Sequence, residues 1–152
     1  MDKVSIIMPV FNSYEFTKES ILSVISQTYS NWELLITDDK STDGTYEKLR
    51  KFVTQDERIK VFRLSKNGGP AVARNNSIEQ ASGKYMAFLD GDDTWKADKL
   101  ERQVKVFEKT PTCPLVYSGY NIVNQAGKCL RYQNVPEKAS YDDLLRSCSI
   151  GC

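Results

Sequence analysis

The chain has 152 residues, enough for one domain with a buried core but too few for two ordinary domains. Its 21 lysine and arginine side chains nearly balance its 20 acidic ones, so no basic excess indicates a nucleic-acid partner. The chain contains no histidine and no Cys-x-x-Cys pair, which argues against a zinc site and excludes a Ser-His-Asp triad. Any chemistry must therefore use carboxylates, a metal ion or groups of the substrate.

No segment approaches the run of about 20 apolar residues that a membrane-spanning helix needs. The first residues also lack the apolar core of a secretory signal. We therefore expect a cytoplasmic protein, and peripheral attachment to the inner membrane surface through parts outside this chain stays open. The cysteines are expected to be unpaired thiols: Cys113, Cys129, Cys148 and Cys152.

The first half of the chain alternates between short apolar runs and stretches with helical spacing. The pattern predicts strands over Val4–Met8, Trp32–Ile36 and Ile59–Leu64. It predicts one helix over Glu15–Gln27 and a second that Asp43 caps and that runs to about Val53.

The second half begins with the same alternation. It predicts, in chain order, a helix that starts at Pro70 and ends near Gly83, a strand over Lys84–Leu89, a helix marked by Leu100, Val104 and Phe107, a strand over Leu115–Tyr117 and a short helix over Tyr141–Arg146. The alternation up to about residue 110 predicts an α/β fold, with a mostly parallel sheet covered by helices on both faces. In such sheets, ligands bind beyond the carboxyl ends of the strands.

Polar clusters follow four successive predicted strands at those carboxyl ends: Pro9-Val10-Phe11-Asn12, Asp38-Asp39, Asn67-Gly68-Gly69 and Asp90-Gly91-Asp92-Asp93. Two carboxylates spaced as Asp90 and Asp92 can share a hard cation such as Mg²⁺ or Mn²⁺, which prefers oxygen ligands and often retains substrate phosphates. The alternative is a turn whose aspartates cap the next helix.

Asp39 can accept a hydrogen bond from an N–H group on a base edge, such as the one that uracil presents. The alternative is that Asp38 and Asp39 begin an Asx turn. The loop Asn67-Gly68-Gly69 precedes a helix whose first backbone amides could favour an anion, although a simple tight turn explains it equally well. Arg74, one turn into that helix, could face the acidic cluster or a phosphate.

These motifs, in this order, resemble the family 2 glycosyltransferases, which have the GT-A fold. The resemblance covers residues 3 to about 108, and it is carried by Val4–Asn12, Ser26–Tyr29, Asp38–Thr45, Asn67–Asn75 and Gly83–Trp95. It implies that residues 1–152 are a single domain, the donor-binding part of a GT-A catalytic domain, which stops before the acceptor-binding part.

The resemblance also implies roles for individual residues. It places Pro9, Val10 and Phe11 around the nucleoside, Asp39 on the base, and Asn67, Gly68 and Arg74 in support of the nucleotide site. It places Asp90 near the ribose and the metal and makes Asp92 the metal ligand, with Mn²⁺ or Mg²⁺ as the cofactor. Phe11 stands where the family usually has tyrosine, and Lys40 adds a charge where a small or polar residue is commoner. The family's general base cannot be assigned to any residue of this chain.

The resulting hypothesis is an inverting glycosyltransferase. It would transfer a sugar from a nucleoside-diphosphate sugar, with UDP as the preferred nucleotide, to a hydroxyl of a glycan or lipid-linked acceptor in polysaccharide biosynthesis. Two alternatives stay open: a nucleotidyltransferase-like enzyme, which would need an early glycine-rich basic loop, and a non-enzymatic α/β module that binds a nucleotide or metal.

Overall fold

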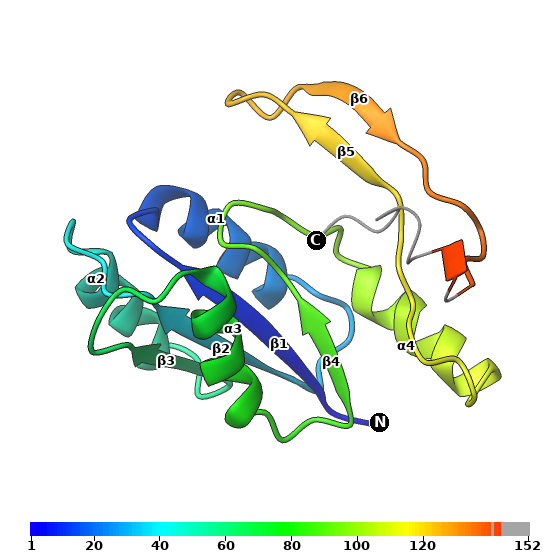
Figure 1. The fold of residues 1–152 in the computed structure, drawn as a ribbon, viewed down its shortest axis with the longest axis horizontal. Helices are drawn as coiled ribbons and strands as arrows, with labels where there is room; N and C mark the ends of the chain where they lie inside the picture. Colours follow the sequence, from blue (N-terminus) through cyan, green and yellow to red (C-terminus); the bar gives the residue numbers. More distant parts are fainter. Residues whose placement is uncertain (141, 144–152) are drawn as a thin grey trace. The chain divides into compact units, whose positions relative to one another are not determined.

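The computed structural model describes residues 1–140 and 142–143 of the chain. The chain divides into two compact units, Met1–Arg102 and Gln103–Cys152. The first unit contains a four-stranded sheet made of β1 (Val4–Val10), β2 (Trp32–Asp38), β3 (Ile59–Arg63) and β4 (Tyr85–Phe88), in the order β3-β2-β1-β4. All three pairings are parallel, so the four carboxyl ends meet at one edge of the sheet (Figure 1).

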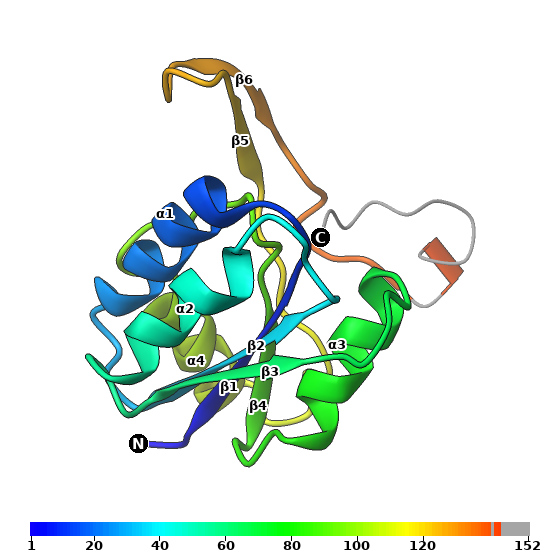
Figure 2. The same cartoon turned by 90° about the vertical axis from the view of Figure 1, so that its left-hand side faces the viewer.

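Helices cover both faces of this sheet, as the sequence predicts. In Figure 2, α1 (Tyr14–Ile25) and α2 (Thr45–Val53) lie on one face and α3 (Pro70–Glu79) lies on the other, packed against β1 and β2. The strand order explains this division, because crossovers between parallel strands are right-handed. The chain moves from β1 to β3 in one direction and returns past β1 to β4, so the helix of the return crossover covers the opposite face.

The two central strands form the core, because both of their faces are covered. Every residue of β2 is buried, and so is every residue of β1 except Pro9. Continuous apolar runs of this kind are typical of parallel strands. The deepest side chains include Ile6, Ile7, Met8, Leu34, Leu35 and Ile36, which are fully buried.

Two predicted helix ends are wrong, for local reasons. Gly44, with φ 82°, is the N-cap residue of α2, and Asp43 lies one position earlier, where it accepts the Thr45 amide. The third helix ends at Glu79 and not near Gly83. Gly83 serves a different need, because a Cβ on it would lie 2.6 Å from the backbone nitrogen of Ser5 in β1.

The second unit contains an antiparallel hairpin of β5 (Tyr120–Val123) and β6 (Cys129–Gln133). The prediction of a strand over Leu115–Tyr117 is wrong. In the described residues those three belong to no sheet, and the first strand of the unit begins three residues later. The hairpin was missed because its strands are almost entirely exposed and show no buried face. The sequence feature that indicates the hairpin is the glycine of its turn, Gly127, which has φ 73°.

The remaining helix and the cysteines complete the sequence predictions. The helix expected from the spacing of Leu100, Val104 and Phe107 is present as α4 (Lys99–Lys109). Most of the short helix expected over Tyr141–Arg146 lies outside the described residues. Cys113 and Cys129 are free thiols, and Cys148 and Cys152 also lie outside the described residues.

A buried carboxylate secures the amino end of the sheet. Glu33 in β2 is only 2% exposed and accepts hydrogen bonds from the Ser5 hydroxyl at 2.7 Å and from the Ser82 amide at 2.9 Å. The ammonium groups of Lys3 and Lys60 lie 3.1 and 3.2 Å from its Oε2. Burial opposes ionisation of Glu33, but these hydrogen bonds outweigh it and lower its pKa to about 2.

We expect Glu33→Gln to destabilise the fold at neutral pH but much less in acid. The folded pKa lies below the unfolded one, so the ionised form contributes stability above the unfolded pKa of about 4.5 and loses it as the pH falls toward about 2. The shift corresponds to about 3 kcal/mol. Urea unfolding of both proteins between pH 7 and pH 2 measures it, and a pH-independent difference would contradict this role.

Candidate nucleotide-binding site

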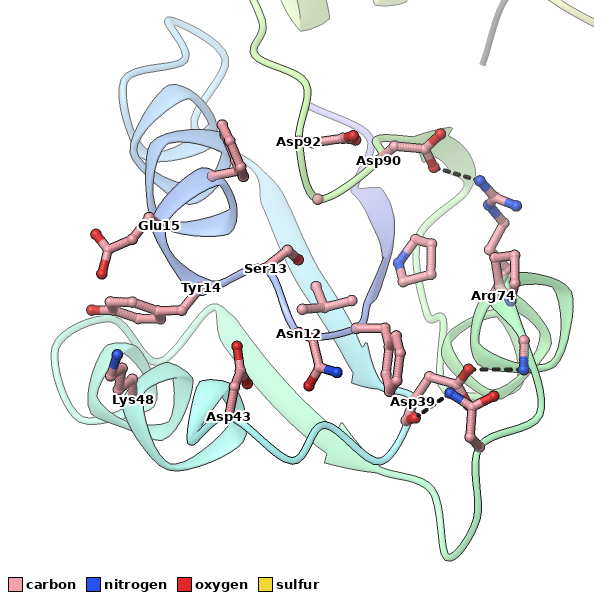
Figure 3. A pocket seen from close by; sticks show the side chains of 18 residues that line it. Asn12, Ser13, Tyr14, Glu15, Asp39, Asp43, Lys48, Arg74, Asp90 and Asp92 are labelled. Atoms are coloured by element: carbon pink, nitrogen blue, oxygen red, sulfur yellow. Dashed lines mark hydrogen bonds and ion pairs between the residues drawn. The ribbon is translucent and has the colours of Figure 1, made fainter. Parts of the chain in front are cut away.

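A pocket of about 840 Å³ lies at the carboxyl edge of the sheet, within the usual size range of small-molecule sites. It brings together eight of the nine residues predicted for the site: Pro9, Val10, Phe11, Asp39, Asn67, Arg74, Asp90 and Asp92 (Figure 3). The ninth, Gly68, is not among the lining residues. Side chains that follow all four parallel strands therefore converge on one cavity, as the strand order requires.

The pocket also includes residues that the sequence argument did not assign. The lining contains Ser13, Tyr14, Glu15 and Phe16, around the start of α1, and Asp43 and Lys48, from α2 and the loop before it. The Lys48 ammonium lies 4.7 Å from the centre of the Tyr14 ring. The position of these residues in the chain could have identified them as pocket residues. Since α1 begins only four residues after β1 ends, its first turn must lie at the same edge of the sheet.

The two acidic residues after β4 differ in their contacts. The Asp90 carboxylate forms an ion pair with the Arg74 guanidinium, which reaches across from α3 (Figure 3). Asp92 is exposed to the pocket, and its side chain forms no hydrogen bond or ion pair with any other described residue. The residue between them is Gly91, which packs closely against β1 and α1. A Cβ at this position would lie 3.1 Å from Thr17 Oγ1 and 3.2 Å from the Pro9 carbonyl oxygen. The close packing of Gly91 fixes the position of the acidic loop.

The acidic loop carries an excess of negative charge. Partial burial of the Asp93 carboxyl, and then the charges of Asp92 and Asp90, raise the pKa of Asp93 above its ordinary value. Among the described residues, Arg74 forms its ion pair with Asp90 and not with Asp92 or Asp93. A cation placed beside Asp92 would therefore relieve repulsion among three neighbouring carboxylates.

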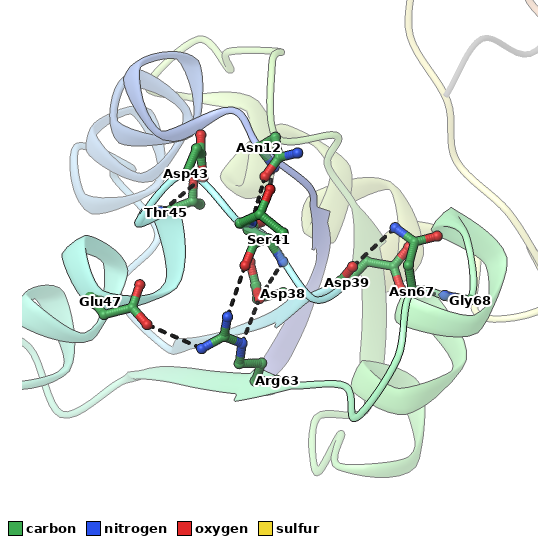
Figure 4. Close-up of polar contacts among 11 residues, drawn as sticks. Asn12, Asp38, Asp39, Ser41, Asp43, Thr45, Glu47, Arg63, Asn67 and Gly68 are labelled. Atoms are coloured by element: carbon green, nitrogen blue, oxygen red, sulfur yellow. Dashed lines mark hydrogen bonds and ion pairs between the residues drawn. The ribbon is translucent and has the colours of Figure 1, made fainter.

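Asp39, which is 3% exposed, joins two strand ends. Its Oδ1 accepts the Gly68 amide at 2.7 Å and its Oδ2 accepts the Gly69 amide at 2.8 Å, while the Asn67 side chain donates to its backbone oxygen (Figure 4). The amides that were expected to face a bound anion thus donate to Asp39 instead. A carboxylate has about four acceptor positions, so Asp39 can still accept an N–H group from a ligand.

The neighbouring aspartate, Asp38, makes the turn. Its Oδ2 accepts the Ser41 amide at 3.0 Å, which is the Asx-turn alternative, while Asp39 remains at the pocket. Asn12 holds the same loop, because its backbone N–H donates to Ser41 Oγ and its side-chain Oδ1 accepts the backbone N–H of Thr42, both at 2.9 Å (Figure 4). This end of the pocket is therefore built from two segments that follow different strands and are hydrogen-bonded to each other.

The parallel four-stranded sheet and the helices on both of its faces define an α/β fold of the GT-A glycosyltransferase type. The family model described as glycosyl transferase family 2 matches residues 5–151, so the chain belongs to this family. Within residues 1–140 and 142–143, no helix is both long and apolar enough to cross a membrane.

Two curated Escherichia coli relatives align with almost the whole chain. One, UDP-Glc:alpha-D-GlcNAc-diphosphoundecaprenol beta-1,3-glucosyltransferase WfgD, is 43% identical over 149 residues, which cover 98% of this chain and 57% of the relative. A second enzyme with the same reaction name, WfaP, is 36% identical over 152 residues, which cover 100% of this chain and 59% of that relative. The chain therefore spans less than two thirds of these relatives' length.

Two solved structures share the fold. Staphylococcus aureus TarS 1-349 in complex with UDP-GlcNAc has a TM-score of 0.66 and 25% identity, with 80% of this chain and 40% of that one covered. The mannosyltransferase PcManGT from Pyrobaculum calidifontis, in complex with GDP-Man and Mn²⁺, has a TM-score of 0.69 and 24% identity, with 80% and 36% covered. The second likeness supports the fold alone.

Proposed function

We propose that this chain supplies the donor-binding part of an inverting glycosyltransferase. In this proposal the whole enzyme transfers a sugar from a UDP-sugar to a hydroxyl group of a glycan or lipid-linked acceptor during polysaccharide biosynthesis. The observation that carries the proposal is the convergence of Asp39, Arg74, Asp90 and Asp92 on one pocket from the segments that follow three different strands, β2, β3 and β4. The names of the E. coli relatives, which specify UDP-glucose and a diphosphoundecaprenol-linked acceptor, support the donor and acceptor classes.

In this proposal the nucleoside lies against Pro9, Val10 and Phe11, with the base edge toward Asp39. Both oxygens of Asp39 already accept a backbone N–H, and each keeps one acceptor position, so the carboxylate can still accept the N–H on the pairing edge of uracil. Gly68 and Asn67 act through Asp39: the Gly68 amide holds its carboxylate, and the Asn67 side chain holds its backbone oxygen. The names of the E. coli relatives, which specify UDP-glucose, support UDP over GDP as the nucleotide of the donor.

The ribose and diphosphate extend toward the acidic loop. Arg74 holds Asp90 in position for the ribose, and the free carboxylate of Asp92 is the ligand for Mn²⁺ or Mg²⁺. No cluster of three or more histidine, cysteine, aspartate or glutamate side chains in the described residues could hold a metal unaided. This agrees with a cation of the magnesium type, which is bound by one or two carboxylates and completes its shell with substrate phosphates and water.

The chemistry follows from this placement. When bound, the cation neutralises charge on the leaving diphosphate. The acceptor hydroxyl attacks the anomeric carbon from the face opposite that diphosphate and loses its proton to a general base, which we do not assign within this chain. Two acids after the acidic loop are otherwise engaged, because Asp98 pairs with Arg102 at 2.6 Å and Glu101 accepts the Thr28 hydroxyl at 2.8 Å.

Calorimetric titration with UDP and GDP, each with Mn²⁺ and then with a chelator, tests the proposal. We expect UDP to bind, to require the metal for full affinity and to bind more tightly than GDP. A chain that binds neither nucleotide, or that binds UDP equally well with the chelator, would contradict the metal-dependent donor site. Preference for GDP would overturn the proposed base recognition while leaving the site itself in place.

A further inference from the structure

Arg63, the last residue of β3, does not line the pocket but contacts the loop that carries Asp39. Its guanidinium has three acceptors: Nη2 donates to the Ser41 carbonyl oxygen at 2.8 Å, Nη1 donates to Glu47 Oε1 at 3.1 Å, and Nε lies 3.4 Å from Asp38 Oδ2 (Figure 4). The group also lies 4.7 Å from the centre of the Tyr46 ring. One side chain therefore spans the loop between β2 and α2.

The contact with Asp38 matters because that carboxylate is 0% exposed. Its Oδ2 accepts the Ser41 amide, and its Oδ1 has no hydrogen-bond partner among the described residues. Within that part of the chain, Arg63 forms the ion pair recorded for Asp38. Removal of the guanidinium would leave a buried charge without a counter-ion, a strongly unfavourable state that the loop can relieve only by moving toward water.

The loop is held in a conformation that it would not adopt unaided. Lys40, between Asp39 and Ser41, has φ 62°, in the left-handed region that a lysine side chain disfavours. Such a residue persists only where its surroundings fix it. Arg63 fixes Ser41 on one side of Lys40, and the Gly68 and Gly69 amides fix Asp39 on the other.

We propose that Arg63 is a positioning residue for recognition of the donor base. It acts through Asp38 and Ser41 to keep the Asp39 carboxylate aimed into the pocket before the nucleotide binds. This inference rests on the proposed function, since it assigns Asp39 to the base. It predicts that loss of Arg63 weakens binding of the base and leaves binding of the diphosphate intact, because the hydrogen bonds and ion pairs of Arg63 within the described residues are with Asp38, Ser41 and Glu47 and not with the acidic loop after β4.

Arg58 provides a matched control at the other end of the same strand. It directly precedes β3 and makes a similar set of contacts, with Asp56, with the Ser30 carbonyl oxygen at 3.1 Å, and with the Trp32 ring at 3.7 Å. The two arginine side chains are similarly exposed, 35% for Arg58 and 29% for Arg63. Arg58 lies at the amino end of the strand, away from the pocket.

The experiment compares Arg63→Met and Arg58→Met with the unmodified chain. Thermal unfolding measures stability, and calorimetry in Mn²⁺ measures affinity for UDP and for inorganic pyrophosphate, which lacks the base. We expect Arg63→Met to weaken UDP by roughly tenfold or more, the loss typical of one charge-assisted interaction, with pyrophosphate unchanged. Arg58→Met should lower the melting temperature and leave both affinities unchanged. Hydrogen exchange of the Ser41 amide should accelerate only in Arg63→Met.

Arg63→Lys provides a second test if the methionine variant does not fold. Lysine keeps the charge opposite Asp38 but cannot serve three acceptors with one planar fork, so UDP should still weaken while the fold remains. A folded Arg63 variant with normal UDP affinity, equal losses for UDP and pyrophosphate, or the same loss in Arg58→Met would overturn this inference alone. Failure of the unmodified chain to bind UDP would overturn the proposed function and this inference with it.

Discussion

Replacing Asp92 with alanine should abolish metal-dependent binding of UDP. The Asp92 carboxylate forms no hydrogen bond or ion pair within the described residues, so its oxygens are available to a cation, and alanine offers no replacement. Even substitutions of residues that only support a metal ligand cost about 10- to 100-fold in metal affinity, so loss of the ligand itself should cost roughly 100-fold or more. Calorimetry of UDP with Mn²⁺ measures the effect.

Asp98→Ala is the matched control for this prediction. Asp98 is an acid shortly after the same loop, but its carboxylate pairs with Arg102 and does not line the pocket. Its loss should leave UDP affinity unchanged. It should lower the free energy of unfolding by no more than an exposed ion pair contributes, about 1 kcal/mol at most. Equal UDP affinity in Asp92→Ala and the unmodified chain would remove Asp92 from the metal site.

Replacing Asp39 with asparagine should impair both the fold and UDP binding. Each oxygen of Asp39 accepts one backbone amide, and an asparagine side chain has only one oxygen. Its NH₂ group would face the N–H of Gly68 or Gly69, so one donor would lose its partner, at a cost of about 1–3 kcal/mol. The displaced loop and the missing charge should together weaken UDP by at least roughly tenfold.

Asp43→Asn separates this effect from a general loss of negative charge. Asp43 also lines the pocket, but its Oδ1 accepts the Thr45 amide, and the amide oxygen of an asparagine can accept the same bond. We expect near-normal stability in urea and near-normal UDP affinity. If UDP and pyrophosphate weaken equally in Asp39→Asn, Asp39 does not contact the base.

Local sequence patterns predicted most of the first unit, because the features that define its strands and helices lie within short segments of the chain. The continuous apolar runs of β1 and β2 identified buried parallel strands, and the strand order then placed the four polar clusters at one edge. The roles proposed for Asp39 and Asp92 came from the family resemblance, because composition and spacing alone left them undecided. The pocket contains eight of the nine predicted residues because parallel strands must end together.

Long-range polar contacts could not be predicted in the same way. Asp39 and Gly68 are 29 residues apart, and nothing local indicates that the carboxylate would occupy the amides expected to be open to a ligand. Arg63 likewise reads as an ordinary surface arginine at the end of a strand. The hairpin of β5 and β6 was missed because almost all of its residues are exposed, so no alternation between a buried and an exposed face marks its strands.

A crystal structure of the chain with UDP and Mn²⁺ tests the central claim most directly, because manganese can be located by its anomalous scattering. We predict the uracil beside Asp39 and Phe11, and the manganese bound to Asp92 and to oxygens of the diphosphate. A nucleotide bound outside the pocket at the carboxyl edge of the sheet, or manganese bound away from Asp92 while UDP occupies that pocket, would contradict the account.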